Sequence, residues 1–242
     1  MASREVCPGL RAGVSFGWQR NAPLPDNLPV IVLGIETSGA PSSLALVGED
    51  FQVEASCLTP FAHAESLNNL LALLEEMVPL GEIDGIALSI GPGFFTSLRA
   101  GSSMAKALAM TLGLPVVGIP TLKALARDSG PGVIACALDA KKGQVYGAVY
   151  RVKNEVCELS PAGIYDPDEF VAISKGFGAT AFAGDGARKY GMKPLVPVKR
   201  PSAITVALMG LEEILEGKSL PTLDFLPDYL REPDAVVKQK SK

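Results

Sequence analysis

The chain contains few of the side chains on which metal sites and nucleophile–base pairs depend. One histidine, His63, stands among 242 residues, which excludes the HExxH zinc arrangement and any site built on two histidines. The four cysteines form no CxxC pair, and we interpret them as free thiols in a reducing compartment. No apolar run approaches the roughly 20 residues that span a bilayer. We therefore expect a cytoplasmic protein without a membrane segment.

An excess of positive charge is also missing. The formal net charge is −4 and the sequence pI is about 5.2. Such a chain is poorly suited to gripping nucleic acid unaided, because phosphate contacts need clustered Lys and Arg. Three basic pairs occur, at 141–142, 188–189 and 199–200. We interpret each of them as solvated surface.

The chain is predicted to have a leader and two folded halves. Residues 1–29 carry four prolines and three arginines and have no apolar segment of the secretory kind, so we predict a disordered leader there. A start codon placed too far upstream and a cleaved organelle transit peptide are the alternatives. Hydrophobic residues make up 48% of the chain, which is ample for a core. A linker-like SGPG at 129–132 separates a first half, 30–128, from a second half, 129–242.

Apolar periodicity predicts the same kinds of element in both halves. In the first half the strands are expected at 30–35, 42–48, 51–58, 83–90 and 115–120, and the helices at 63–78, 95–112 and 121–128. In the second half the strands are expected at 132–140, 143–152, 155–161 and 179–186, and the helices at 166–176 and 202–217. Thr121 and Asp166 are predicted helix N-caps.

The two halves repeat one architecture. Glu36 closes the first strand of one half as Asp139 closes the first strand of the other, and each is followed by a turn, a strand, a turn and a third strand. Two βββα-type halves of this kind resemble the duplicated actin, Hsp70 and sugar-kinase (ASKHA) fold, an α/β architecture that binds nucleotide between its halves. By that resemblance the nucleotide-facing turns would contain Glu36, Thr37, Ser38, Asp139, Lys141, Gly184 and Asp185.

The stretch SIGPGFFTSLRAG, residues 89–101, lies between a predicted strand and a predicted helix. It lacks the lysine and second glycine of a P-loop and the last glycine of a GxGxxG fingerprint. Donors at the helix start could still attract an anion, but two phenylalanines favour packing. We therefore favour a rigid structural corner, made of Gly91, Pro92, Gly93, Phe95 and Arg99.

The two helices on either side of this corner have apolar residues on more than one face. Leucines recur at three and four in helix 63–78, and Leu98, Gly101, Ala105 and Leu108 do so in helix 95–112. Both helices could simply cover a sheet, or one face of each could meet a partner. The residues predicted for a partner interface are His63, Leu67, Leu70, Leu74, Leu98, Gly101, Met104 and Leu108.

Several motifs resemble the TsaB (YeaZ) family of tRNA threonylcarbamoyladenosine biosynthesis proteins. GPGFFTSLRAG resembles the family's GPGSFTGLRxG signature, and the ending PDYLREPDA resembles PxYLRxPxA. Four further segments also resemble motifs of the family: LGIETS, HAESL, LDAKKGQVYGAVY and AGDGARKY. All of these motifs occur in the family's order along the chain. Three residues depart from the family pattern: Glu36 replaces Asp, Phe94 replaces Ser and Ser97 replaces Gly. Glu36 is one methylene longer than Asp and would misplace a magnesium-bound water, which argues against a nucleotide role for the first turn.

The resemblance implies a non-catalytic subunit without a metal site. It would pair with a TsaD-like catalytic protein through a four-helix bundle, with a TsaE-like ATPase as a third member, and would support threonylcarbamoyl transfer to the adenosine beside the tRNA anticodon. It implies tRNA contact only through the complex, a homodimer when the partner is absent, and no cofactor on this chain itself, with Mg-ATP or Mg-ADP in the complex.

Two other functions are open from the residues alone. One is a small-molecule kinase or ATPase of the same fold, which would need tight Mg-nucleotide binding by the isolated chain. The other is a peptidase of the M22 type, but the sequence has no GxSxG elbow and no metal-binding histidine pair.

Overall fold

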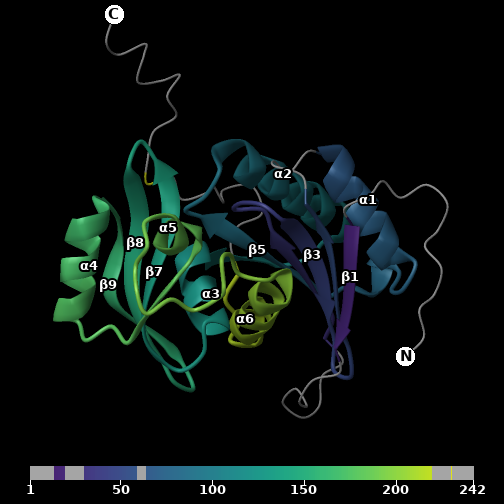
Figure 1. The fold of residues 1–242 in the computed structure, drawn as a ribbon. Coiled ribbons are helices and arrows are strands. Elements are labelled where there is room, and N and C mark those ends of the chain that lie inside the picture. Colours follow the sequence, from purple (N-terminus) through teal and green to yellow (C-terminus); the bar gives the residue numbers. More distant parts are fainter. Residues whose placement is uncertain (1–13, 20–29, 59–63, 220–229, 231–242) are drawn as a thin grey trace, which may run out of the picture.

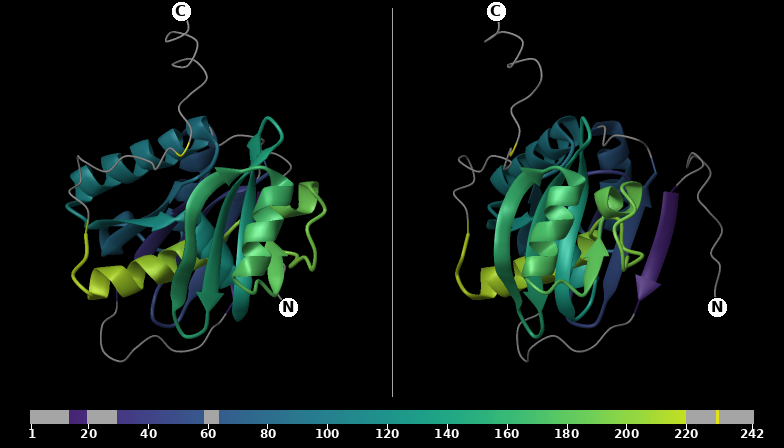
Figure 2. Two further views of the ribbon diagram at one scale, coloured as in Figure 1. Left: turned by 90° about the vertical axis from the view of Figure 1, so that its left-hand side faces the viewer. Right: turned by 60° about the vertical axis from the view of Figure 1, so that its left-hand side comes forward.

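Two α/β halves lie side by side in the computed structural model of the chain (Figure 1). The structure describes residues 14–19, 30–58, 64–219 and 230. Each half has a central sheet with helices on both of its faces, as two further views show (Figure 2).

The first half is built on a six-stranded sheet in the order β1-β4-β3-β2-β5-β6. The strands β2, β3 and β4 form an antiparallel meander, and β5 and β6 continue the sheet in parallel beside β2. The strands β2 and β3 are buried throughout, as expected of continuous apolar runs covered on both faces. The strands are β1 (Val14–Gln19), β2 (Val32–Glu36), β3 (Ser42–Val47), β4 (Gln52–Cys57), β5 (Gly85–Gly91) and β6 (Val116–Pro120).

The strand β1 lies within the segment predicted as a disordered leader. It pairs antiparallel with β4 at the sheet edge. The remainder of that predicted leader lies outside the described residues, as does His63.

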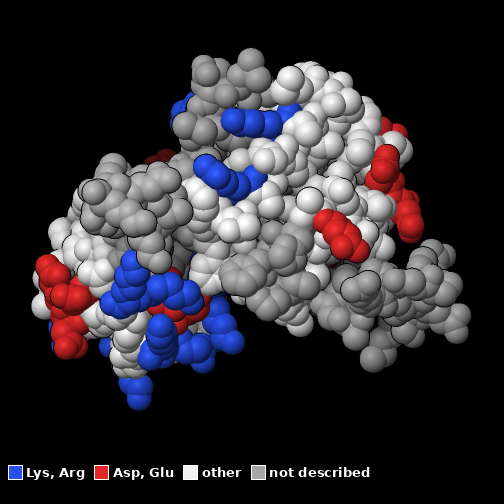
Figure 3. Space-filling view, turned by 90° about the horizontal axis from the view of Figure 1, so that it is seen from above, with Lys and Arg blue, Asp and Glu red and all other residues white. Residues whose placement is uncertain are grey.

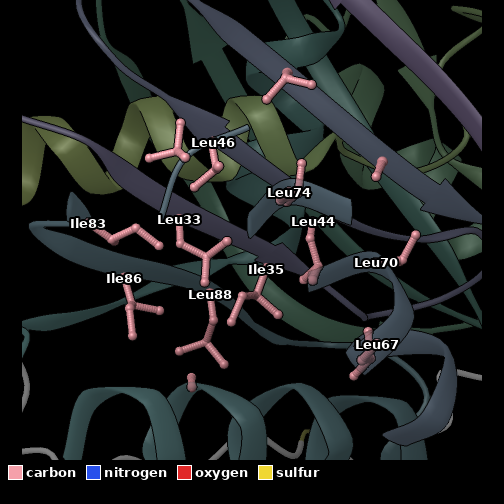
Figure 4. Close-up of a cluster of buried hydrophobic side chains, with 14 of the residues drawn as sticks. Leu33, Ile35, Leu44, Leu46, Leu67, Leu70, Leu74, Ile83, Ile86 and Leu88 are labelled. Carbon is pink, nitrogen blue, oxygen red and sulfur yellow. The ribbon is translucent and has the colours of Figure 1, made fainter. Parts of the chain in front are cut away.

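One face of this sheet is covered by α1 (Ala64–Glu75) and α2 (Phe95–Leu112). Leucines from α1 interdigitate with inward side chains of β2, β3 and β5, and Ala105 and Ala109 of α2 complete this cluster (Figure 4). A short 3₁₀ turn, η1 (Leu80–Glu82), leads back into the sheet. The helix α2 ends at Gly113, whose φ of 72° suits the left-handed cap that glycine favours.

The other face of the first sheet is covered by α6 (Ala203–Leu215), a helix from the far end of the chain. It approaches closely because a Cβ on Gly34 would lie 2.2 Å from the Ala203 carbonyl oxygen, and a Cβ on Gly210 would lie 2.2 Å from Ala87 Cβ. The domain assignment that grouped all of 129–242 is therefore wrong for this helix, which packs with the first half.

The start of α6 is held by side chains of the first half. Its N-cap residue, Ser202, accepts a hydrogen bond from Thr205 N at 3.1 Å. Asp128 accepts from Ser202 N at 2.7 Å, and Glu54 accepts from Ala203 N at 2.7 Å. These bonds satisfy backbone donors that every helix start leaves open, and they join distant parts of the chain.

The second half is built on a four-stranded sheet in the order β10-β7-β8-β9. Its strands β7, β8 and β9 form an antiparallel meander, and β10 pairs in parallel with β7. This is the relation that β2, β3 and β4 have to β5, so the predicted duplication is confirmed. The strands are β7 (Gly132–Lys141), β8 (Gln144–Val152), β9 (Val156–Tyr165) and β10 (Ala181–Ala183).

Helices also cover both faces of this second sheet. The helix α3 (Thr121–Asp128) packs on one face with Leu122 and Leu125, while α4 (Pro167–Gly176) and α5 (Asp185–Lys189) pack on the other. The helix α4 begins after Asp166 with Pro167 in its first turn, as predicted, but the Asp166 side chain makes no capping hydrogen bond. Thr121 is not a cap, because Pro120 holds that position and the Thr121 hydroxyl accepts from Gly91 N instead.

Candidate functional site: a closed cleft between the halves

The turn that follows β2 is buried inside the molecule. Glu36, Thr37 and Ser38 have no exposed surface. A Cβ on Gly101 of α2 would lie 2.3 Å from Thr37 Oγ1, so the helix start presses directly on this turn. The turn therefore has no surface to offer a ligand in this structure.

The GPG corner packs on the same turn. A Cβ on Gly93 would lie 2.3 Å from the Ser38 carbonyl oxygen, and Gly91 adopts a φ of 115° that disfavours other residues. Phe94 N donates to the Ser38 oxygen at 2.8 Å and Gly91 N donates to Thr121 Oγ1 at 3.2 Å. Because these donors bond within the protein, the corner does not present them to an anion.

Glu36 is a carboxyl group enclosed by protein. Its Oε1 accepts from Ser38 N at 2.7 Å and from the Ser38 hydroxyl, while its Oε2 has no hydrogen-bond partner among the described residues. Burial raises the pKa of Glu36 above its ordinary value of 4.5, although the hydrogen bonds from Ser38 and the charge of Arg200 act in the opposite direction.

We expect Glu36→Gln to remove a pH dependence of stability. The folded pKa is raised, so the wild-type carboxyl resists ionising when folded, and stability is lost as the pH rises from 4.5 through the folded pKa. Over that interval the variant should gain about 1.4 kcal/mol per pH unit relative to wild type. Urea unfolding at a series of pH values measures this, and parallel curves for the two proteins would contradict it.

In the second half, the acidic turn is partly exposed and carries its own cations. Asp139, at the end of β7, accepts from Lys141 Nζ at 3.0 Å and from Lys189 Nζ at 3.0 Å. Burial tends to raise the pKa of Asp139, but the hydrogen bonds from Lys141 and Lys189 together hold it below its ordinary value. Asp139 N donates to Asp185 Oδ1 at 2.9 Å, which ties α5 to the end of β7.

The start of α5 also needs glycine for close packing. Gly184 has a φ of 110°, and a Cβ there would lie 2.1 Å from the Ala137 carbonyl oxygen. The sequence predicted only a turn at this point, because five residues are too few for helical periodicity to be recognised.

Arg200 joins the two turns across the cleft. Its side chain is 4% exposed and pairs with Asp185 Oδ2 at 2.7 Å. Its Nη1 donates to the Ser38 carbonyl oxygen at 3.1 Å, and its guanidinium lies 5.3 Å from the centre of the Phe94 ring. Sequence reasoning treated Arg200 only as half of a solvated basic pair, since nothing in the local pattern shows a contact 162 residues away.

The turn after β2 and the acidic turn of the second half leave no room for a nucleotide between them. A phosphate or magnesium ion would need the first turn exposed, whereas that turn is sealed by Gly93, Gly101 and the Arg200 guanidinium. Asp139 and Asp185, the carboxylates of the second turn, are engaged by Lys141, Lys189 and Arg200. The structure brings all the predicted nucleotide-facing residues to one region but fills that region with protein.

The predicted partner-interface residues divide into two groups. The four leucines are each 1% exposed, and Gly101 packs against Thr37. The prediction that these residues face a partner is therefore wrong for Leu67, Leu70, Leu74, Leu98 and Gly101. Met104 and Leu108 are half-buried against the same core. The side chains that α1 and α2 do expose include Ala72, Ala107 and Met110, with Met77 just after α1. The stripes of leucine and small residues therefore face the sheet.

Neither a metal cluster nor a membrane helix is found in the described part of the chain. No group of three or more His, Cys, Asp or Glu side chains there could hold a metal ion. No helix among these residues is long and apolar enough to cross a membrane.

The fold defines a class: an α/β protein of duplicated ASKHA-like architecture. A family model described as "TsaD: tRNA N6-adenosine threonylcarbamoyltransferase" matches residues 59–200. An uncharacterized protein of Mycobacterium tuberculosis is 31% identical over 79% of this chain and 83% of its own length. The structure of YeaZ from Pseudomonas aeruginosa superimposes with a TM-score of 0.72 and 25% identity, covering 83% of this chain and all of that one.

A named relative narrows the assignment. The "tRNA threonylcarbamoyladenosine biosynthesis protein TsaB" of Bacillus subtilis is 32% identical over 52% of this chain and 58% of its own length. The chain therefore belongs to the TsaD family of the matching model and, within it, to the TsaB (YeaZ) family.

Proposed function

We propose that this protein is a non-catalytic subunit in the biosynthesis of tRNA threonylcarbamoyladenosine. It pairs with a TsaD-like catalytic protein through the outer face of α1 and α2. The observation that carries the proposal is the cleft between the halves, where Arg200 bridges Asp185 and Ser38. A molecule that fills its own nucleotide cleft with an ion pair is suited to a supporting role.

Support for the pairing surface comes from the exposed apolar side chains of the helix layer. Met110 on α2 is 64% exposed and Met77 after α1 is 44% exposed. Ala107 is exposed one turn before Met110, and small residues let a neighbouring helix approach closely. Seen from above, much of the surface over these helices is uncharged (Figure 3). Methionine is a side chain that adapts well to a partner surface.

The rest of the assembly follows from this proposal. The outer face of α1 and α2 would also form a homodimer when the TsaD-like protein is absent. A TsaE-like ATPase would complete the complex in the cytoplasm, and Mg-ATP or Mg-ADP would be held by those partners rather than in this chain's cleft.

Co-purification with the TsaD-like protein of the same organism tests the pairing. We expect Ala107→Glu/Met110→Glu to weaken the complex at least about 100-fold, because two carboxylates would be buried in an apolar interface. The matched control, Phe177→Glu/Leu215→Glu, makes the same charge change at exposed apolar positions outside the helix layer and should leave the complex intact. Sedimentation of the isolated chain should show loss of the homodimer with the first variant only.

Two results would contradict the proposed function. One is a complex that survives Ala107→Glu/Met110→Glu unchanged in a variant that is folded by circular dichroism. The other is sub-micromolar binding and turnover of Mg-ATP by the isolated chain in calorimetry, which would favour the kinase or ATPase alternative.

A further inference from the structure

Three basic pairs that are far apart in the sequence meet at one end of the second half. Asp139 N bonds to Asp185, which places the β7–β8 turn beside α5. Asp185 N in turn donates to the Lys199 carbonyl oxygen at 3.0 Å, which places segment 197–200 beside both. Lys and Arg side chains gather there in the lower left of the view from above (Figure 3). We define the basic surface by its exposed members Lys141, Lys142, Arg188, Lys189 and Lys199.

The charge of this surface is opposite to that of the whole chain. Segments 139–143, 185–189 and 197–200 carry six cationic side chains and two carboxylates, a local charge of +4 in a chain whose net charge is −4. The Asp139 side chain is only 9% exposed beneath the two ammonium groups that it holds. It therefore positions Lys141 and Lys189 at the surface, where a local potential of this sign attracts anions.

Aromatic rings lie among these cations. Lys189 Nζ is 5.1 Å from the centre of the Tyr190 ring, and Lys141 Nζ is 5.1 Å from that of Phe94. Tyr190 and Phe94 are both half-buried. Cations with interspersed aromatic rings are typical of surfaces that bind nucleic acid strands.

The arrangement suits a repeated anion better than a single one. A lone phosphate is recognised by donors that converge on it, whereas Lys141 and Lys189 converge on Asp139 and the other cations project from separate segments. A phosphate backbone presents charges in series and is bound by lysines acting as point charges.

We propose that the basic surface contacts the phosphate backbone of RNA, namely the tRNA of the proposed function, on which this inference rests. Contact with tRNA is then made by this chain itself and not only through its partners. Five of the six side chains of the basic pairs are exposed, as interpreted from the sequence, and Arg200 is buried. Tertiary structure joins the pairs into one surface, which the sequence did not show.

Fluorescence anisotropy of the full chain with an unmodified tRNA transcript tests this proposal. We expect Arg188→Glu/Lys199→Glu to lower the affinity at least about tenfold at roughly 50 mM salt, and to make the slope of log affinity against log salt shallower by about 1.5–2. The matched control is Lys153→Glu/Lys175→Glu, which makes the same charge change at exposed positions. Lys153 lies just beyond β8, at the opposite end of that strand from the β7–β8 turn, and this variant should bind nearly as wild type.

The outcome is separable from that of the pairing experiment. Arg188→Glu/Lys199→Glu should still co-purify with the TsaD-like protein, and Ala107→Glu/Met110→Glu should still bind the transcript. Equal weakening by the basic-surface variant and its control would overturn the inference, as would wild-type protein that shows no binding at low salt. Either result would leave an acidic protein segment as the other class of partner to test.

Discussion

Leu70→Glu should unfold the protein, whereas Asn69→Glu at the adjacent position should change its stability by no more than about 0.5 kcal/mol. Leu70 is 1% exposed and packs with Leu44 and Leu74 in the core beneath α1 (Figure 4). Truncating such a leucine alone costs about 2–5 kcal/mol, and a buried unpaired carboxylate adds several more. The total approaches the roughly 5–15 kcal/mol that stabilises a domain.

The comparison between neighbours makes this prediction specific. Asn69 is exposed on the same helix. Both variants introduce the same side chain and the same change in net charge, and their helix propensities differ by only a few tenths of a kcal/mol because one loses leucine and the other asparagine (on the order of 0.4 kcal/mol). Urea unfolding followed by circular dichroism measures both stabilities, with Leu70→Ala as an intermediate case. A folded Leu70→Glu protein of near wild-type stability would mean that this face of α1 is not covered by the sheet.

Arg200→Ala should lower the free energy of unfolding by about 2–3 kcal/mol. The change removes a side chain that pairs with Asp185 and donates to Ser38, and hydrogen bonds to charged groups contribute about 1.5–3 kcal/mol. This loss of stability is smaller than the loss expected on breaking a fully buried ion pair, because the Asp185 side chain is 32% exposed and water can solvate it. In a protein of this size the midpoint of thermal unfolding should fall by roughly 5–10 °C.

A double-mutant cycle separates the ion pair from the rest of the Arg200 contacts. Asp185→Asn removes the charge but keeps an oxygen that can accept from Asp139 N. We expect a coupling of about 1–2 kcal/mol between Asp185→Asn and Arg200→Ala. If the two effects add independently, Arg200 does not act by joining the two turns.

Much of the architecture could be predicted from local pattern. The buried strands β2 and β7, the long helix α2 with its Gly113 cap and the Asp166–Pro167 start of α4 follow from apolar runs, 3–4 spacing and capping chemistry. These features depend on residues close in sequence, where backbone preferences and the side-chain period act directly. The repeated order of elements was sufficient to predict the duplicated fold.

The faces of the helices could not be predicted in the same way. Leucines on more than one side of α1 are compatible with either side facing the sheet, and the choice depends on side chains such as Leu44 of β3 that lie elsewhere in the chain. The docking of α6 on the first half was missed for the same reason, since it depends on close contacts at Gly34 and Gly210.

The sequence by itself determined most of the secondary structure, the repeat and the motifs that resemble the TsaB (YeaZ) family, because each of these depends on neighbouring residues. It did not determine β1 or the short helix α5. Only the tertiary structure decided that Arg200 closes the cleft against Ser38 and that three modest basic pairs form one surface. The physical reason is that hydrogen bonds and electrostatic potential depend on distance in space, and chain folding brings together groups that are remote along the sequence.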